Sequence, residues 1–283
     1  MTFRTRFAPS PTGPLHLGHA YSGMLAYDLA QAHEGEFLLR IEDIDQSRAR
    51  PEWEALIFED LRWLGLQWSL PVMRQSERQQ AYGHALDRLW DHGLLYPCSC
   101  SRADIAAATS APQEGAPLLG PDGVVYPGTC RETANRTGKR PQDMALRLDM
   151  AQALATLTQP LSFEETGVTP AHHHIDPKML LTHVGDAVLA RRDMGTSYHL
   201  SVVLDDAAQD ISHVVRGADL FEATYIHVVL QSLLGLPTPI YHHHRLIRDA
   251  AGKRLAKRDD ARAISHYRDI GKTISDIISL TSA

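Results

Sequence analysis

The chain has 283 residues, a formal net charge of −6 and 43% hydrophobic residues, which is typical of a globular protein that can bury a substantial core. It has no apolar run near the ~18 residues that a membrane span needs, and Pro9 and Pro11 leave no room for a secretory signal at the start. Three cysteines are too few for a disulfide scaffold, so we expect a cytoplasmic protein. The acidic balance disfavours non-specific coating of nucleic acid, although it leaves room for a local basic surface.

The first third of the chain alternates between strand and helix patterns. Residues 3–8 predict a strand, residues 17–32 predict a helix with apolar side chains at helical spacing, and residues 36–41 predict a second strand. A strand, a helix and a strand within roughly forty residues form a βαβ unit with parallel strands. Amphipathic patterns predict further helices at 53–64 and 78–90.

The pattern changes at residue 96. From there to about residue 140 the chain holds all three cysteines, many prolines and glycines, and little periodicity, which indicates an insertion without a core of its own. Beyond it we predict strands at 144–148 and 187–192, a helix at 225–234 and a strand at 240–247. A basic loop and a helical tail complete the chain.

These patterns predict an α/β fold, with a Rossmann-like, doubly wound parallel sheet, an inserted subdomain and a small C-terminal helical part. The predicted divisions are the first half of the sheet domain at 1–95, the insertion at 96–190, the second half at 191–236 and the C-terminal region at 237–283. The segment 202–215 carries three aspartates between apolar residues, and the pattern alone assigns them no role.

The segment Pro9-Ser-Pro-Thr-Gly-Pro-Leu-His-Leu-Gly-His19 connects the first predicted strand to the first predicted helix. Its spacing places His16 and His19 on one side of the first turn, and Gly18 lets a ligand approach the backbone. Unpaired N–H groups and the positive end of the helix dipole favour an anion there. The turn from Gly13 to His19 therefore predicts a phosphate site. The alternative is a plain strand–turn–helix with incidental histidines.

A basic loop, Gly252-Lys-Arg-Leu-Ala-Lys-Arg258, follows the last predicted strand. Such loops are usually solvated surfaces or nucleic-acid contacts. If this loop folds over the same edge of the sheet, Lys257 meets the charge that develops on a phosphoryl group. The two motifs together, about 240 residues apart, favour one nucleotide site built from both ends of the chain.

Four segments carry a resemblance to a known family. His16-Leu-Gly-His19 and Arg254-Leu-Ala-Lys-Arg258 resemble the two signatures of the class I aminoacyl-tRNA synthetases. Arg6-Phe-Ala-Pro-Ser-Pro-Thr-Gly13 and Arg40-Ile-Glu-Asp-Ile-Asp45 are similar to the glutamyl/glutaminyl branch, and the resemblance covers nearly the whole chain. Ordinary glutamyl-tRNA synthetases continue into an anticodon-binding domain, for which this length leaves no room. The chain is similar throughout to the short glutamyl-Q tRNA(Asp) synthetases, which lack that domain.

This resemblance implies ATP-dependent activation of L-glutamate to glutamyl-adenylate, with Mg²⁺ accompanying ATP. Glutamate then passes to the queuosine base in the anticodon of tRNA(Asp). His16, His19 and Lys257 are the expected catalytic residues. The expected ATP-binding residues are Gly13, His16, Gly18, His19 and Lys257. The basic stretches 131–140 and 253–262 are candidates for gripping the RNA, and we expect a monomer with no membrane partner.

A glutamate site needs a cation for the side-chain carboxylate and an anion for the ammonium group. Arg6 and Arg216 are candidates for the first role, because guanidinium groups fit carboxylates, and Glu42 for the second. The alternative for any single charged residue is a surface ion pair. By resemblance the pocket is lined by Arg6, Phe7, Ala8, Pro9, Ser10, Glu42, Tyr198 and Arg216.

The cysteines of the insertion form a further motif, Cys98-Ser-Cys100 with Cys130. Three thiolates are one ligand short of a tetrahedral zinc site, whereas three cysteines can also be unrelated core residues. Their shared place in a segment without a core favours metal. The resemblance supplies Tyr126 as the fourth ligand, although the stretch between Cys100 and Tyr126 is longer than the family has it. We expect one structural zinc per chain.

Two histidine triplets, 172–174 and 242–244, do not predict a metal site, because consecutive side chains on a strand point to opposite faces. Of these six residues only His244 is a candidate for the adenine pocket. Two other functions stay open: a truncated glutamyl-tRNA synthetase that charges tRNA(Glu), and a small nucleotidyltransferase that shares the His-x-Gly-His turn. A non-catalytic paralogue is disfavoured by the presence of His16, His19 and Lys257.

Overall fold

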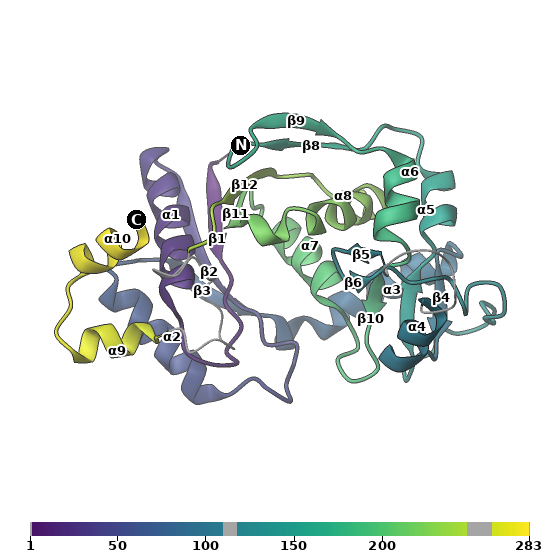
Figure 1. Ribbon diagram of the computed structural model, residues 1–283, viewed down its shortest axis with the longest axis horizontal. Coiled ribbons are helices and arrows are strands. Elements are labelled where there is room, and N and C mark those ends of the chain that lie inside the picture. Colours follow the sequence, from purple (N-terminus) through teal and green to yellow (C-terminus); the bar gives the residue numbers. More distant parts are fainter. Residues whose placement is uncertain (1, 110–117, 248–261, 283) are drawn as a thin grey trace.

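The computed structural model of the chain describes residues 2–109, 118–247 and 262–282 (Figure 1). Its centre is a largely parallel sheet. On one side, β1, β2 and β3 are parallel; on the other, β11, β12 and β8 are parallel and β9 joins the edge antiparallel. The two sides meet where β11 lies beside β1, and the Ser212 N–H donates to the Arg4 carbonyl there. The strands are β1 (Arg4–Phe7), β2 (Glu36–Ile41), β3 (Ser69–Arg74), β8 (Ser162–Glu165), β9 (Ala171–His174), β11 (His213–Gly217) and β12 (Ile240–His244).

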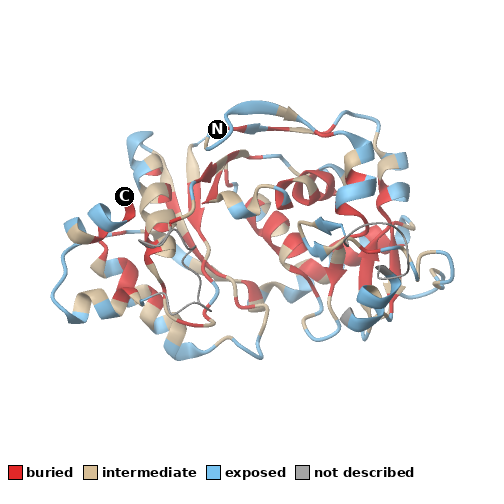
Figure 2. Ribbon diagram, viewed as in Figure 1, coloured by how far each residue is buried: buried red, intermediate tan, exposed pale blue. Residues whose placement is uncertain are grey.

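Helices cover both faces of this sheet. Leu39 and Val215 point to the face covered by α1 (Leu17–Ala32) and α2 (Pro51–Trp63), and α9 (Ile264–Asp269) and α10 (Ile274–Ser282) extend that layer. Val214 and Tyr241 point to the other face, where α3 (Gln79–Asp91), α7 (Tyr198–Ala208) and α8 (Ala223–Leu234) pack. Val214 and Val215 are buried in different cores because successive strand residues alternate between faces. Figure 2 shows the buried residues on the facing sides of the helices and the sheet.

A smaller antiparallel region continues from α3. Its three-stranded sheet has the order β10-β7-β4, and a two-stranded hairpin and short helices lie around it. The strands are β4 (Leu95–Cys98), β5 (Leu119–Gly120), β6 (Gly123–Val124), β7 (Ala145–Leu148) and β10 (Val188–Ala190). The helices are α4 (Arg102–Thr109), α5 (Met150–Thr156) and α6 (Pro177–Met179), the last followed by a π-helical turn at Leu180–Val184. Short 3₁₀ helices at Gln75–Arg78 and Ala218–Leu220 complete the elements.

The predicted α/β fold with a parallel sheet is confirmed. The helix at 17–32 and the strand at 36–41 have the predicted bounds. The aspartate-bearing segment 202–215 is the end of α7 followed by most of β11. The sequence patterns missed β3, α5 and the hairpin of β8 and β9. The domain divisions stay a prediction, and β8, which is numbered within the predicted insertion, hydrogen-bonds to β12 of the main sheet.

Within the described parts of the chain, none of the helices combines the length and the apolar character that crossing a membrane requires.

Candidate active site

A cavity of about 450 Å³ opens where β1, β2, β11 and β12 end and α1 begins. Open parallel sheets place their ligand sites at this edge. The cavity is lined by nearly all of the residues predicted for the nucleotide and glutamate sites that the structure describes: Arg6, Phe7, Ala8, Pro9, Ser10, His16, Gly18, His19, Glu42, Tyr198 and Arg216. Gly13 is not among its lining residues. Lys257 lies outside the described residues.

The two histidines of the first turn cap α1 with their own rings. The Gly18 N–H donates to His16 Nδ1, and the His16 N–H donates to His19 Nδ1, each across 3.1 Å. A ring nitrogen that accepts a backbone proton has none of its own, so each neutral ring carries its proton on Nε2. The ring centroids lie 3.8 Å apart. The turn therefore fixes both rings side by side, in the tautomer whose Nε2–H donates to an anion.

The expected close approach of a ligand to Gly18 stays a prediction, and the structure shows a local role for this glycine in the turn. A Cβ atom at this position would lie 3.1 Å from Cε1 and 3.2 Å from Nδ1 of His16. These contacts are tighter than ordinary packing, so glycine at position 18 makes room for the ring that caps the helix. Gly18 also lines the cavity.

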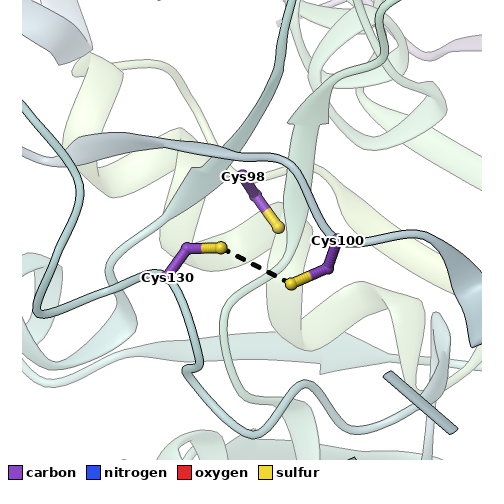
Figure 3. Close-up of side chains that lie close together, drawn as sticks. All are labelled: Cys98, Cys100 and Cys130. Carbon is purple, nitrogen blue, oxygen red and sulfur yellow. Dashed lines mark hydrogen bonds between the residues drawn. The ribbon is translucent and has the colours of Figure 1, made fainter. Parts of the chain in front are cut away.

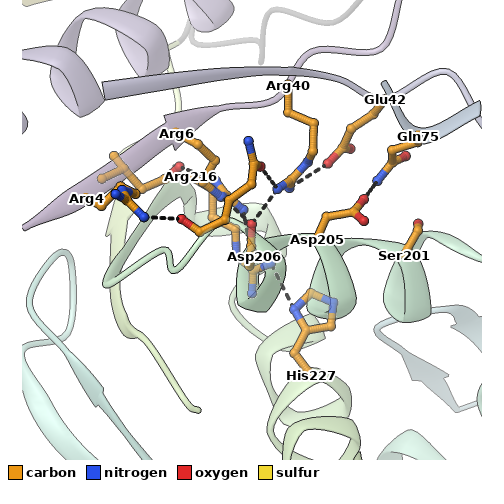
Figure 4. A network of polar contacts seen from close by, with 12 residues as sticks. Arg4, Arg6, Arg40, Glu42, Gln75, Ser201, Asp205, Asp206, Arg216 and His227 are labelled. Carbon is orange, nitrogen blue, oxygen red and sulfur yellow. Dashed lines mark hydrogen bonds and ion pairs between the residues drawn. The ribbon is translucent and has the colours of Figure 1, made fainter. Parts of the chain in front are cut away.

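A buried ion network forms the wall behind the cavity (Figure 4). Arg6 binds Asp206 of α7 through both Nε and Nη2, at 2.9 and 3.1 Å, and Arg40 of β2 donates to the same carboxylate at 2.8 Å. Burial opposes ionisation, but the two guanidinium groups hold the pKa of Asp206 below its usual range. Arg6 therefore has an internal partner and holds the wall of the site together.

Glu42 follows β2 and points its carboxylate into the same region. Its Oε1 accepts a hydrogen bond from Arg40 at 3.1 Å, and the residue lines the cavity. Burial raises the pKa of Glu42, while the nearby charges of Arg40 and Arg6 oppose that rise. Glu42 thus places a carboxylate in the site, where it suits an ammonium group.

Arg216 is the second predicted cation and lies at the carboxyl end of β11, with 5% of its surface exposed. Its hydrogen bonds go to uncharged acceptors: Thr224 Oγ1 at 2.7 Å, His243 Nε2 and His227 Nδ1 at 3.1 Å, and the Tyr198 hydroxyl at 3.4 Å. Among the residues described, no carboxylate lies within 4 Å of its guanidinium group. Arg216 consequently brings a positive charge to the cavity that no anion of the described residues neutralises by contact.

The sequence patterns missed several parts of this site. Asp206 and Arg40 were not assigned, although a buried aspartate between apolar residues was the signal that pointed to a partner. His244 lines the cavity together with Leu246 and Ile247, at the point where the described chain stops before residue 248. The remaining lining residues that sequence reasoning did not single out are Thr12, Ser22, Val215, Gly217, Asp219 and Leu220.

The chain returns beside the cavity after the undescribed stretch. The Ile264 N–H donates to the Leu15 carbonyl at 2.8 Å, and Ala263 pairs with His16 in an isolated bridge. Residues 247 and 262 therefore both lie close to this cavity. The basic loop that carries Lys257 joins these two points of the chain.

The cysteine cluster lies in the antiparallel region, and Figure 3 shows its three sulfurs directed toward one another. The Sγ atoms of Cys98, Cys100 and Cys130 all lie within 4.8 Å of one another. The Tyr126 hydroxyl is 3.4 Å from Cys98 Sγ and 3.5 Å from Cys100 Sγ, and it accepts the Cys130 N–H at 2.9 Å. The structure thus brings together all four residues predicted as zinc ligands.

The donor set fits zinc on chemical grounds. Zn–S bonds of ≈ 2.3 Å in a tetrahedron put sulfurs roughly 3.8 Å apart, and Cys100 and Cys130 are 3.4 Å apart. Burial raises the pKa of Cys100 to about 11. Burial also acts to raise the pKa of Cys130, but the Tyr126 hydroxyl and the Ser99 N–H outweigh it and lower that pKa to about 6. A lowered pKa at Cys130 favours the thiolate, which is the form that binds metal.

The basic stretch at 131–140, a predicted RNA contact, has internal partners. Arg131 pairs with Asp186 at 2.7 Å, Arg136 with Asp149 at 2.9 Å, and Arg140 with Asp87 at 2.7 Å. These arginines fasten the loop to β10, α5 and α3 or their flanks. Their ion pairs support a structural role and weaken the case that this stretch grips phosphates.

Comparisons with known proteins agree with this geometry. The profile of the family described as tRNA synthetases class I (E and Q), catalytic domain, matches residues 2–280. A glutamyl-Q tRNA(Asp) synthetase of Rhodobacter capsulatus is 64% identical over 96% of this chain and 97% of its own length. A protein of the same name from Geobacter sulfurreducens is 41% identical over 94% of this chain and 78% of its own length.

Solved structures show the same similarity at greater distance. A glutamate tRNA ligase from Elizabethkingia meningosepticum, crystallised in complex with its amino acid, superposes with a TM-score of 0.70 at 26% identity. The glutamate-tRNA synthetase of Elizabethkingia anophelis superposes with a TM-score of 0.71 at 25% identity. Both matches cover 96% of this chain but only 53% and 54% of the solved chains, so this chain spans about half their length.

Proposed function

The chain belongs to the glutamate and glutamine branch of the class I tRNA synthetases, and within it to the glutamyl-Q tRNA(Asp) synthetases; on this premise we propose that it activates glutamate with ATP and attaches it to the queuosine of tRNA(Asp). One observation carries the proposal. The paired imidazoles of His16 and His19, the Glu42 carboxylate and the Arg216 cation line a single cavity. These groups are complementary to the phosphates, the ammonium group and the side-chain carboxylate that the first step brings together.

Glutamate binds with its side-chain carboxylate on Arg216 and its ammonium group near Glu42. Arg216 takes this role because its contacts within the described structure are uncharged, whereas Arg6 already binds Asp206 through two nitrogens. Residues 7–10, which line the cavity directly after β1, enclose the amino acid.

Activation needs no general base, because the α-carboxylate of glutamate is ionised at neutral pH. Its oxygen attacks the α-phosphorus of ATP, the bond to the β-phosphate breaks, and pyrophosphate leaves. Catalysis is then a matter of positioning and charge stabilisation. The Nε2–H groups of His16 and His19 donate to phosphate oxygens, and Lys257 meets the developing charge. Mg²⁺ bound with ATP neutralises phosphate charge in such reactions.

The mixed anhydride then passes glutamate to a hydroxyl of the modified base, and AMP leaves. The basic segment 253–262 stays the candidate for the RNA contact. Cys98, Cys100, Tyr126 and Cys130 would hold one structural zinc, which closes a loop region with little core of its own. A cytoplasmic location and a monomeric state stay predictions.

The decisive experiment is glutamate-dependent exchange of pyrophosphate into ATP, followed by transfer to tRNA(Asp) that carries or lacks queuosine. We expect exchange that requires glutamate and transfer that requires queuosine. Lys257→Ala, and separately His16→Ala, should each lower the exchange rate ~10²–10³-fold. Lys139→Ala, an exposed lysine outside the cavity, is the matched control and should leave exchange unchanged.

Other outcomes would select the alternatives. Charging of tRNA(Glu) in place of tRNA(Asp) would identify a truncated glutamyl-tRNA synthetase. Nucleotide exchange that does not depend on glutamate would identify a small nucleotidyltransferase. Full exchange by Lys257→Ala would remove that residue from the mechanism while leaving the assignment of the cavity in place.

A further inference from the structure

Arg216 lies between two histidines that only accept hydrogen bonds from it. Its Nε donates to His243 Nε2 and its Nη1 to His227 Nδ1, each at 3.1 Å. A guanidinium group has five N–H donors and no acceptor. Each of these ring nitrogens must therefore present a lone pair. A protonated imidazole, or the other neutral tautomer, would set two N–H groups against each other at a buried site.

A buried carboxylate fixes the ring of His243 from its far side. Glu165 Oε2 lies 2.6 Å from His243 Nδ1, and Oε1 of the same carboxylate accepts the backbone N–H groups of His243 at 3.0 Å and Gly167 at 2.7 Å. Both side chains of this pair are fully buried. The Glu165 carboxylate therefore holds the His243 proton on Nδ1 and leaves Nε2 as the acceptor for Arg216.

A second chain of hydrogen bonds fixes His227 in the same way. Because His227 Nδ1 accepts from Arg216, its proton is on Nε2, which faces His199 Nδ1 at 3.1 Å. His199 in turn places Nε2 at 3.3 Å from Asp122 Oδ1. This chain also ends at a carboxylate, one imidazole further from Arg216. Burial and the charge of Arg216 lower the pKa of His227 well below 6.5 and that of His243 to about 4, which agrees with two neutral rings.

The arrangement separates Arg216 from its counter-charges. Arg6, by contrast, touches the Asp206 carboxylate directly. In the described structure Glu165 and Asp122 reach Arg216 only through imidazoles, so its guanidinium is held in place without contact neutralisation. A ligand carboxylate recovers that interaction, whereas a carboxamide brings no charge and replaces one of the two acceptor oxygens by an NH₂ donor, for which the guanidinium group has no acceptor.

Resting on the proposed function, we propose that Glu165 and Asp122 are positioning residues that select glutamate over glutamine. They act through His243 and the His199–His227 pair, which hold the guanidinium group of Arg216 in place without a contacting negative charge. The proposal depends on the neutral tautomers of His243 and His227. Their ring nitrogens accept hydrogen bonds from the buried guanidinium group but carry no negative charge, so the positive charge of Arg216 stays available to the substrate carboxylate.

Glu165→Gln tests the proposal because two backbone N–H groups fix the orientation of the new side-chain amide. The N–H groups of His243 and Gly167 require its oxygen, so its NH₂ faces His243 Nδ1. The His243 proton is then displaced to Nε2, against Arg216. We expect the KM for glutamate in the exchange reaction to rise about 10- to 100-fold, with the KM for ATP unchanged and kcat within about threefold. The preference for glutamate over glutamine should fall.

Asp60→Asn is the matched control, because Asp60 is a fully buried carboxylate bound by Arg268 and is not part of the cavity lining. It should leave both KM values unchanged. His243→Gln, which retains an acceptor for Arg216, should keep more glutamate affinity than His243→Leu. An unchanged KM for glutamate in folded Glu165→Gln would overturn the proposal, as would equal KM values for the two His243 variants.

A second readout does not depend on catalysis or on the variants folding. Long-range ¹H–¹⁵N correlation spectra of the ¹⁵N-histidine-labelled full chain report the tautomers directly. We expect His243 protonated only on Nδ1, and His227 only on Nε2. Observation of a proton on His243 Nε2 would overturn the proposal. Absence of glutamate-dependent exchange with both tautomers as expected would instead count against the proposed function alone.

Discussion

The cavity and the cysteine cluster both gather polar side chains away from water, but different forces hold them. The cavity lies between two extensive apolar cores that cover the two faces of the sheet. Among the residues that the structure describes, the core around the cysteines has Tyr96, Cys98 and Tyr126 as its buried members. Where the core is large, the rigid helices and strands packed on it hold the buried charges in position. Where the core is small, the loop region depends on other links, such as side chains that bind a metal. The two regions should therefore respond differently to loss of a polar side chain.

The largest effect is expected at the buried charge network of the cavity. Asp206→Ala leaves Arg6 and Arg40 without their shared carboxylate, and an uncompensated buried charge costs about 3–5 kcal/mol of unfolding free energy. Urea denaturation measures this loss. The matched control is Asp210→Asn, which removes an exposed charge and keeps a residue that tolerates the positive φ of 50° at this position. The Asp210 side chain pairs with Arg4 at 3.4 Å but is 87% exposed, so loss of its charge should cost less than ~1 kcal/mol. Equal effects of the two changes would show that the network does not stabilise the fold.

A slightly smaller effect is expected from pH, and its sign follows from the neutral rings beside Arg216. The pKa of His243 is lowered to about 4, and that of His227 lies well below 6.5, whereas both take up a proton near pH 6.5 in the unfolded chain. Stability from these rings is therefore fully present above about pH 6.5 and is lost as the pH falls toward 4. For His243 the loss approaches about 3 kcal/mol.

Urea denaturation at pH 7, 6 and 5 checks this dependence. His243→Gln should flatten the fall in unfolding free energy, because glutamine does not titrate. His84→Gln, at an exposed position on α3, should leave the slope unchanged. A slope in the His243 variant as steep as in the parent protein would assign the pH dependence to other groups.

The contrast between the regions also explains what the sequence could predict. The helix at 17–32 and the strand at 36–41 follow local periodicity, so their bounds were predictable. The residues that line the cavity came largely from motif resemblance, and the structure brings them together around one space. The partners of Asp206 and Glu165 could not be predicted, because each acts on a residue far away in the sequence, Arg6 and His243 respectively. Local sequence patterns compare residues that are close in the chain, so they do not indicate contacts between residues that are far apart in it.

The antiparallel region was harder to predict for the same reason. Its short strands pair residues from both ends of the insertion, as β4 does with β7, and little periodicity marks them. The four residues predicted as zinc ligands nevertheless lie together. They could be predicted because the spacing of metal ligands can be recognised in a sequence that shows no hydrophobic periodicity. The loop that carries Lys257 lies outside the described residues, so its place in the mechanism stays a prediction.

A more local effect is expected at the cysteine cluster. Cys100→Ala removes one of four ligands, so the purified protein should lose its zinc, about one atom per chain measured by plasma mass spectrometry. Limited proteolysis should then cut the region 96–140 faster, while glutamate-dependent exchange stays within about threefold of the parent. Ser99→Ala, in the same loop, should keep the metal. Retention of full zinc by Cys100→Ala would exclude the site, and loss of exchange would show that the two regions are coupled.

The smallest effect on stability and substrate binding is expected at the first turn of α1, which lines the cavity. Gly18→Ala should gain ~0.5–1 kcal/mol from helix propensity, but its Cβ would press on the His16 ring at 3.1 Å and loosen the cap that sets the tautomer. We expect little net change in stability and a rise in the KM for ATP of about fivefold at most, the equivalent of a ~1 kcal/mol cap. Gly23→Ala, whose Cβ meets the Phe7 ring at an ordinary 3.5 Å, should gain the same helix propensity on the same helix and leave the KM unchanged. If both alanines leave the KM for ATP unchanged, a small displacement of the His16 ring does not affect nucleotide binding. The nucleotide site would then depend on the position of the turn more than on the tautomer that the cap of α1 selects.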